Sequence, residues 1–301
     1  MDDVTDVVFR QVVAEVAPPD VLFTEFVSTD GLQSAGRKVT LERLRIEPDL
    51  KLPLVAQIWG SDPEHYYQSA RDIAALGFTG IDINLGCPEK SIVARGCCGG
   101  LIGQNDRVTD IIAATKAGAP DLPLSIKTRL GLGQIITEEW AGFLLTQNLA
   151  ALIIHGRTVR EMIRVPAHWD EIAKIPALRD QLAPGTVIVG NGDIENHAHG
   201  LELVAKTGVD GIMIGRGIFH DIFAFAPSQP DPTPEIMLPI LLRHLDLYEA
   251  SSIKSFNTLK KFFKIYVHGW PGSADLRVRL MDAASPAEVR DILAHQSISV
   301  K

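Results

Sequence analysis

Segments with strand-like and helix-like patterns alternate along most of this chain, and no other feature of the sequence constrains the fold as much. Strands joined by helices run parallel, because the helical connection returns the chain to the edge of the sheet where it started. Apolar, β-branched segments predict strands at residues 20–25, 53–57, 80–84, 122–127, 151–155, 186–190 and 211–214. Apolar residues at helical spacing predict helices within residues 1–17 and at 62–76, 108–117, 137–147, 169–175, 194–207 and 218–225.

Each predicted strand ends in a polar residue or a glycine turn. A closed (β/α)8 TIM barrel gathers the ends of all its strands around one site, and it fits this repetition better than an open sheet, whose site lies at one switch point. Only seven complete strands are predicted, since the first helix begins almost at Met1. We expect that the natural chain starts upstream of Met1 or that the first strand has been lost, which would leave two strand edges unpaired.

A proline-rich segment at residues 227–234, PSQPDPTP, predicts a linker. It divides the chain into a barrel domain at 1–226 and a small helical domain at 235–301, with helices expected at 235–250, 253–267 and 286–295. The chain has no apolar run of the roughly 18 residues that span a bilayer, no apolar signal sequence after its acidic start, and cysteines without paired zinc-type spacing. We expect a cytoplasmic monomer with reduced thiols, no metal and no membrane partner.

The formal net charge of −8 argues by itself against a nucleic-acid partner. Residues 251–280 differ from the rest, because they carry six basic side chains and one acidic side chain, Asp275. The basic residues are Lys254, Lys260, Lys261, Lys264, Arg277 and Arg279. A local positive field of this kind can bind phosphates on a protein that is acidic overall.

The stretch at residues 80–100, GIDINLGCPEKSIVARGCCGG, carries the most specific pattern in the chain. Its strand stops before Pro88, because proline lacks a backbone donor and fixes its own φ. Cys87 thus lies at the carboxyl end of a buried strand, the edge that holds the site in α/β barrels. It is either a small buried apolar residue or a functional thiol, and only the protonated form can donate a proton. Cys97 and Cys98 are interpreted as packing residues of the glycine loop.

The last two predicted strands end in glycine turns, which carry Asn191, Asp193, Gly215 and Arg216. These are either ordinary tight turns or a phosphate site, in which backbone N–H groups and the charge of Arg216 hold the anion. We favour the phosphate site, because two such turns occupy the last two loops of the predicted barrel.

Four more polar residues lie at the ends of predicted strands: Gln57, Asn84, Lys127 and His155. Lys127 and His155 are either cations that stabilise negative charge on a cofactor ring, or structural side chains in salt bridges and hydrogen bonds. Gln57 and Asn84 either donate to the carbonyls of a bound ring or cap their own turns. The sequence leaves both pairs of alternatives open.

Several motifs together resemble those of the bacterial tRNA-dihydrouridine synthase family. They are LGCPEK with the following GCCGG, SIKTRLG at 125–131, IIHGRT at 153–158, VGNGDI at 189–194 and MIGRG at 213–217. The opening MDDVTDVVFR and the basic segment LKKFFKIYVHGWPG at 259–272 are also similar to family motifs, so the resemblance spans nearly the whole chain. It implies an FMN-binding TIM barrel followed by a helical tRNA-binding domain.

The resemblance also implies an activity, the reduction of the 5,6 double bond of a uridine in tRNA, with NADPH as electron donor. FMN N5 would deliver hydride to C6 of the uracil, and Cys87 would protonate C5 as the general acid. The implied contacts to FMN are Met1, Gln57, Lys127, His155, Asn191, Asp193, Gly215 and Arg216. The implied contacts to the RNA are Asn84 beside the base and Lys254, Lys260, Lys261 and Lys264 along the backbone.

Two other functions remain open from the sequence. One is an FMN-barrel dehydrogenase of a free pyrimidine, of the dihydroorotate type, which would leave the basic helical domain without a purpose. The other is a catalytically inactive RNA-binding barrel, and the presence of Cys87, Lys127 and His155 argues against it.

Overall fold

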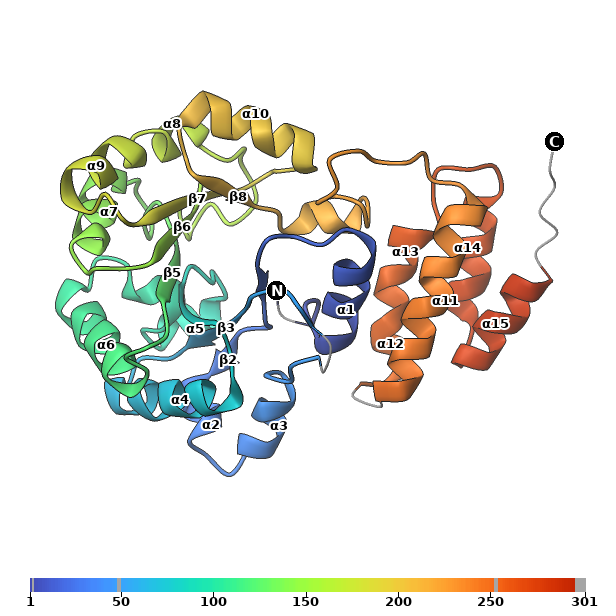
Figure 1. The fold of residues 1–301 in the computed structure, drawn as a ribbon, viewed down its shortest axis with the longest axis horizontal. Helices are drawn as coiled ribbons and strands as arrows, with labels where there is room; N and C mark the ends of the chain where they lie inside the picture. The colour runs from blue at the N-terminus through green and yellow to red at the C-terminus, as the bar shows by residue number, and fades with distance from the viewer. Residues whose placement is uncertain (2, 48–49, 252–253, 296–301) are drawn as a thin grey trace.

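The structure is a computed structural model that describes residues 1, 3–47, 50–251 and 254–295. Its centre is a parallel sheet that curls into a partial barrel, with helices along the outer side (Figure 1). The strands are β1 (Leu22–Phe23), β2 (Val27–Ser28), β3 (Leu54–Trp59), β4 (Gly80–Leu85), β5 (Leu124–Arg129), β6 (Ala151–His155), β7 (Val187–Asn191) and β8 (Gly211–Met213). The predicted TIM-barrel architecture is confirmed in this curled form.

Each of the seven predicted strand positions is occupied in the sheet. β1 and β2 are two-residue segments that pair with the two ends of β3, so together they fill one strand position. Among the described residues, the hydrogen-bonded order runs β1-β3-β4-β5-β6-β7-β8 and does not close from β8 back to β1. Helix α1 (Val7–Val16) shares a hydrophobic core with Ile194, Ile214 and Ile218, which lie beside the β8 edge.

Helices alternate with the strands as predicted, and their starts follow capping chemistry. Asp6 Oδ1 accepts from the backbone N–H of Phe9, and Asp62 Oδ1 accepts from that of Glu64, both at 2.9 Å. After α1 the helices are α2 (Thr29–Leu32), α3 (Arg37–Glu42), α4 (Pro63–Leu76), α5 (Lys90–Ala94), α6 (Asn105–Gly118), α7 (Thr137–Leu145), α8 (Trp169–Ile172), α9 (Ile175–Leu182) and α10 (His197–Thr207), with 3-10 turns η1 (Cys98–Leu101) and η2 (Arg216–Phe219).

The structure corrects three of the predicted helices. The helix predicted at 253–267 is divided, within the described residues 254–267, into short elements at Phe256–Leu259, Lys260–Phe262 and Phe263–Tyr266. The segment predicted at 169–175 is the short helix α8, and a separate helix, α9, begins at Ile175 with a proline in its first turn. The segment predicted at 218–225 is only the 3-10 turn η2, which ends at Phe219. Helices this short depend on tertiary packing rather than on local propensity, so periodicity places them poorly.

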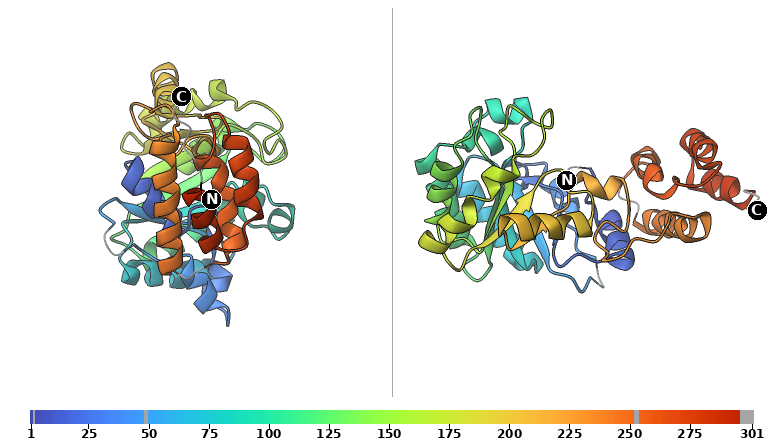
Figure 2. Two further views of the ribbon diagram at one scale, coloured as in Figure 1. Left: turned by 90° about the vertical axis from the view of Figure 1, so that its right-hand side faces the viewer. Right: turned by 90° about the horizontal axis from the view of Figure 1, so that it is seen from above.

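Residues after the proline-rich segment form a helical group beside the partial barrel, on the side where α1 lies (Figures 1 and 2). Its elements are α11 (Pro234–Ser251), α12 (Phe256–Leu259), η3 (Lys260–Phe262), α13 (Phe263–Tyr266), α14 (Ser273–Asp282) and α15 (Pro286–Ala294). Phe9 of α1 packs on Phe262, with ring centroids 4.5 Å apart. The helical group therefore shares a core with α1, while the domain division at residues 227–234 stays a prediction.

No helix in the described part of the chain combines the length and the apolar character that crossing a membrane would require.

Candidate active site

The register of the sheet brings polar residues of three strands together at its inner face. Gln57 on β3, Asp82 on β4 and Ser125 on β5 are direct cross-strand partners. Gln57 Nε2 donates to Asp82 Oδ2 (2.7 Å), and Ser125 Oγ donates to Asp82 Oδ1 (2.6 Å). Burial raises the pKa of Asp82 to about 6. This row gives the site a buried carboxyl group that holds the Gln57 amide in one orientation.

Asn84 links this row to the loop that carries Cys87. Its Nδ2 donates to Gln57 Oε1 (3.1 Å), and its Oδ1 accepts from the backbone N–H groups of Gly86 and Cys87, both at 3.0 Å. Asn84 therefore caps its own turn, which is one of the two roles that the sequence left open for it. Gln57 is held between Asp82 and Asn84.

Cys87 lies directly after β4 and is partly exposed. Its carbonyl accepts from the backbone N–H of Gly99 (3.3 Å), which folds η1 back onto the loop. A hydrogen bond from Cys98 lowers the pKa of the Cys87 thiol to about 7, although burial opposes the shift. The same hydrogen bond, together with burial, raises the pKa of Cys98, so Cys98 stays protonated and is the donor. The interpretation of Cys98 as a packing residue is thus incomplete, since its buried thiol also contacts Cys87.

Cationic side chains surround His155 at the end of β6. Burial lowers its pKa to about 2, and four cations add to the effect: Lys127, Arg129, Arg157 and Arg216. His155 is therefore a neutral imidazole, and its Nε2 accepts from the Arg157 guanidinium at 3.1 Å. Of the two roles left open for His155, this contact matches that of a hydrogen-bonded structural side chain.

Lys127 on β5 keeps a positive charge at the inner face of the sheet. Its Nζ donates to Asn191 Oδ1 (2.9 Å), and Asn191 Nδ2 donates to the Met213 carbonyl (2.7 Å), so the contact connects β5, β7 and β8. Burial lowers the pKa of Lys127 to about 8. That value leaves most of the amine protonated at neutral pH.

The turn after β7 places Asp193 among the cations. Arg157 donates to the Asp193 carboxylate, Arg216 approaches it at 3.3 Å, and the backbone N–H of Ala167 donates to it at 2.9 Å. Burial raises the pKa of Asp193, but the hydrogen bonds from Arg157 and Ala167 outweigh burial and hold this pKa below its usual value. The preceding Gly192 has a φ of 129°, a conformation that side chains rarely adopt.

Three residues of this cluster were not among the sequence candidates: Asp82, Arg129 and Arg157. Arg129 Nε donates to the Gly86 carbonyl (2.7 Å), and Arg157 Nε donates to the Val165 carbonyl (2.6 Å), so both arginines also hold loops in place. Each of the three is separated by two positions from a candidate, namely Asn84, Lys127 or His155. Residues two apart on a strand share a face, and this spacing was the available signal for Asp82 and Arg129. Arg157 lies beyond the end of β6, where this rule does not apply.

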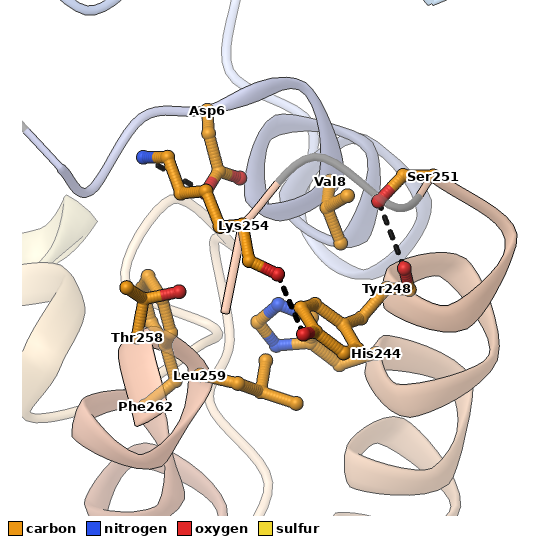
Figure 3. A pocket seen from close by; sticks show the side chains of 9 residues that line it. All are labelled: Asp6, Val8, His244, Tyr248, Ser251, Lys254, Thr258, Leu259 and Phe262. Carbon is orange, nitrogen blue, oxygen red and sulfur yellow. Dashed lines mark hydrogen bonds and ion pairs between the residues drawn. The ribbon is translucent and has the colours of Figure 1, made fainter. Parts of the chain in front are cut away.

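Lys254 differs from the other lysines predicted to contact RNA, because it lies among carboxylates. Its Nζ lies 3.0 Å from Glu25 and 3.4 Å from both Asp3 and Asp6, and its side chain is 18% exposed. Burial lowers the pKa of Lys254, but these carboxylates outweigh burial and hold this pKa above its usual value. Figure 3 shows Lys254 beside Asp6 at a small cavity lined by α1, α11 and α12. Lys254 thus has a structural role that the sequence did not predict, and its charge is already neutralised.

Of the other three lysines, Lys264 is exposed and Lys260 and Lys261 are partly exposed, and the contacts of all three are to carbonyls or to a ring. Lys260 and Lys261 donate to the carbonyls of Met281 and Asp3, and Lys264 Nζ lies 4.7 Å from the centre of the Phe219 ring. None of these contacts neutralises the positive charge. Met1, the remaining candidate, donates through its terminal ammonium to Thr5 Oγ1 (2.8 Å) and packs on the core that α1 shares with the helical group.

Fold and site together define a (β/α) barrel protein with a cluster of cationic side chains and a thiol at the carboxyl ends of its strands. In overall fold it is similar to a variant of NCR from Zymomonas mobilis, with a TM-score of 0.50 and 17% identity over 77% of this chain and 87% of the other. It is also similar to a mutant of morphinone reductase in complex with tetrahydroNAD, with a TM-score of 0.52 and 10% identity over 78% of this chain and 85% of the other.

A family model described as dihydrouridine synthase (Dus) matches residues 1–300. The chain is 46% identical over 298 residues to "Probable tRNA-dihydrouridine synthase" of Staphylococcus aureus (strain COL), covering 97% of this chain and 90% of the relative. It is 43% identical over 298 residues to "Probable tRNA-dihydrouridine synthase 2" of Bacillus subtilis (strain 168), covering 97% and 91%. The chain belongs to the dihydrouridine synthase family and is therefore an enzyme of the oxidoreductase class.

Proposed function

We propose that this protein is a cytoplasmic tRNA-dihydrouridine synthase, which reduces the 5,6 double bond of a uridine in tRNA with FMN as cofactor and NADPH as electron donor. The names and the identity of its relatives support the activity and the substrate. The observation that carries the chemistry is the position of Cys87, a partly exposed thiol at the carboxyl end of β4 on the rim that also holds the cationic cluster.

The residues of this cluster fit FMN, which is an anion. Four cations lie around His155, and the cluster's carboxylates that face them are Asp193 and, beside Lys127, Asp82, so the cluster has an excess of positive charge that a bound phosphate would neutralise. A Cβ built on Gly215 would have its nearest neighbour at 3.9 Å, so the backbone there is open to a ligand. The turns with Asn191, Asp193, Gly215 and Arg216 would hold the phosphate.

Lys127 would hold a proton at Nζ facing the flavin ring, with neutral His155 and Gln57 as hydrogen-bonding partners and Met1 at its edge. When bound, FMN supplies the hydride that C6 of the uracil receives. An anion bound nearby would raise the pKa of His155, because it would oppose the charges that lower it.

Cys87 would hold at Sγ the proton that C5 of the uracil receives. A pKa of about 7 keeps much of the thiol protonated at neutral pH, and a general acid works best when its pKa is near the working pH. The hydrogen bond from Cys98 and the charge of Arg129 would stabilise the thiolate that remains after proton transfer. Both features favour Cys87 as the acid of the reaction.

The RNA backbone would be held by Lys260, Lys261 and Lys264, which keep their charge in the structure. Lys254 would act indirectly, because it holds α1 to the helical group through Asp3 and Asp6. Asn84 would lie beside the target base. That base must leave the stack to reach Cys87, at a cost of about a few kcal/mol.

The test is a reaction of the purified protein with FMN, NADPH and unmodified tRNA, read by mass spectrometry of the nucleosides. We expect dihydrouridine from the native protein and none from Cys87→Ala, which should still bind FMN and tRNA. Cys97→Ala is the matched control, because Cys97 donates to the Arg95 carbonyl (3.8 Å) in the same loop, and it should stay active. Full activity of Cys87→Ala would refute the general-acid role.

The same assay separates the two alternative functions. Reduction of a free pyrimidine with no reaction on tRNA would show a dehydrogenase of the dihydroorotate type. A colourless protein that takes up no FMN but binds tRNA would show an inactive RNA-binding barrel.

A further inference from the structure

Five hydrogen bonds form one continuous chain from the inside of the barrel to the backbone of Cys87. Ser125 Oγ donates to Asp82 (2.6 Å), Gln57 Nε2 donates to Asp82 (2.7 Å), Asn84 Nδ2 donates to Gln57 Oε1 (3.1 Å), and the Gly86 and Cys87 amides donate to Asn84 Oδ1 (3.0 Å). The side chains of Asp82, Gln57 and Asn84 are all at least 94% buried, so water does not replace these bonds.

The direction of this chain is determined at both of its ends. The backbone amides of Gly86 and Cys87 can only donate, so Asn84 must present its oxygen to them and its amino group to Gln57. Gln57 must then present its oxygen to Asn84 and its amino group to Asp82. Every donor in this series of hydrogen bonds has an acceptor only if the group at position 82 accepts a hydrogen bond. A carboxylate is the side chain that accepts hydrogen bonds without donating one.

We propose that Asp82 is a positioning residue for Cys87, because its carboxylate sets the orientation of the Gln57 and Asn84 amides and thereby the clamp on the Cys87 backbone. The proposal rests on the function proposed above only in giving Cys87 its role in the reaction. The clamp itself is a property of the protein without cofactor or RNA.

Asp82→Asn tests the direction of the chain with a side chain of the same shape. If the oxygen of the introduced amide accepts from Ser125, the amino group of the introduced amide faces the amino group of Gln57. Reversing the Gln57 amide and then the Asn84 amide only moves this conflict, because the Asn84 amino group would then face the Cys87 N–H. Rotation of the introduced amide would satisfy Gln57, but its amino group would then donate to Ser125 Oγ, and the Ser125 hydroxyl would have to donate to the Ile81 carbonyl at 3.5 Å. Asp82→Asn therefore either leaves one donor–donor contact or replaces the 2.6 Å bond from Ser125 with a longer one.

The readout is alkylation of Cys87 by iodoacetamide in the protein without flavin or RNA, followed by mass spectrometry of the peptide. Alkylation needs the thiolate, and the thiolate fraction of Cys87 depends on its contact with Cys98. We expect Asp82→Asn to slow alkylation at neutral pH by about 10-fold, by analogy with the lower end of the effect found when the hydrogen-bond partner of a metal-ligating side chain is changed. With tRNA, kcat should fall while KM for tRNA stays the same.

The double variant Gln57→Glu with Asp82→Asn exchanges the carboxylate and the amide and restores an acceptor between two donors. We expect it to recover the alkylation rate that each single variant loses. Ser125→Ala is the control, because it removes a hydrogen bond of the same carboxylate and leaves the direction of the chain unchanged; its rate should match that of the native protein.

An unchanged rate in Asp82→Asn, or no recovery in the exchanged pair, would overturn the positioning role. Because alkylation is measured without substrate, a native protein that makes no dihydrouridine would refute the proposed function and leave this result intact.

Discussion

Cys98 shows how the backbone conformation of one residue can change the role of another. Its φ is 49°, in the left-handed region that residues with a side chain seldom occupy, and it is fully buried. A conformation of this kind persists only where the surrounding structure maintains it, and it often marks a functional site. Here it brings the Cys98 thiol against Cys87 and lowers the pKa of Cys87 to about 7.

Replacing Cys98 with alanine should raise the pKa of Cys87 above about 7, because the hydrogen bond from Cys98 is the largest cause of the lowering. The measurement is the rate of Cys87 alkylation as a function of pH, whose midpoint should move to higher pH. Cys97→Ala removes a neighbouring buried thiol and should leave the midpoint in place. A midpoint that is the same in all three proteins would mean that Cys98 only packs.

At the scale of elements, the turns after β6 and β7 are built as one unit. Arg157, from the first turn, contacts His155, Asp193 and the Val165 carbonyl. The second turn needs glycine at position 192, because a Cβ there would lie 2.7 Å from the Ala167 Cβ and 3.2 Å from His155 Cδ2. The close contact between the two turns therefore places His155 beside Asp193.

Gly192→Ala should lower the free energy of unfolding by about 1 to 3 kcal/mol, the usual cost of a side chain in such a backbone conformation. It should also weaken FMN binding, because the Ala167 and His155 contacts must shift. Urea unfolding and quenching of FMN fluorescence measure the two effects. Gly185→Ala is the control, since a Cβ there meets nothing within 4 Å, and it should change neither quantity. Native stability in Gly192→Ala would contradict this account of the turn.

At the scale of the whole molecule, the helical group and α1 depend on each other. Phe9, Phe262 and His244 pack together in the shared core, and burial lowers the pKa of His244 to about 3. Removing residues 235–301 would expose this core and leave Asp3, Asp6 and Glu25 without Lys254. Surface substitutions in the intact chain are therefore the sound way to test RNA binding by the helical group.

The combined change of Lys260→Ala and Lys261→Ala should weaken tRNA binding and reduce its dependence on salt. Each lost phosphate contact removes about 0.7 to 0.9 from the slope of log K against log salt concentration, so the slope should fall by about 1 to 2. Filter binding over a range of salt concentrations measures it. Lys206→Ala, an exposed lysine on α10, should bind tRNA like the native protein. An unchanged slope in the double variant would place both lysines outside the interface.

The order of strands and helices, the parallel sheet and the edge that carries Cys87 could all be predicted from the sequence, because each is encoded by local periodicity. Most errors fell on short elements such as α8 and η2, whose formation depends on packing. Of the site, the sequence identified the residues that end strands, including Asn84, Lys127 and Asn191. It missed Asp82, Arg129 and Arg157, each of which looks locally like an ordinary strand or turn residue.

By itself, the sequence determined which residues lie at the carboxyl ends of the strands, since alternation and turn residues act over a few positions along the chain. The tertiary structure alone decided which of them touch. The register of β3, β4 and β5 sets Gln57, Asp82 and Ser125 in one row, and the burial of His155 among four cations makes that imidazole neutral. Register and burial arise from contacts between distant segments, and such contacts leave no periodic trace in a single chain.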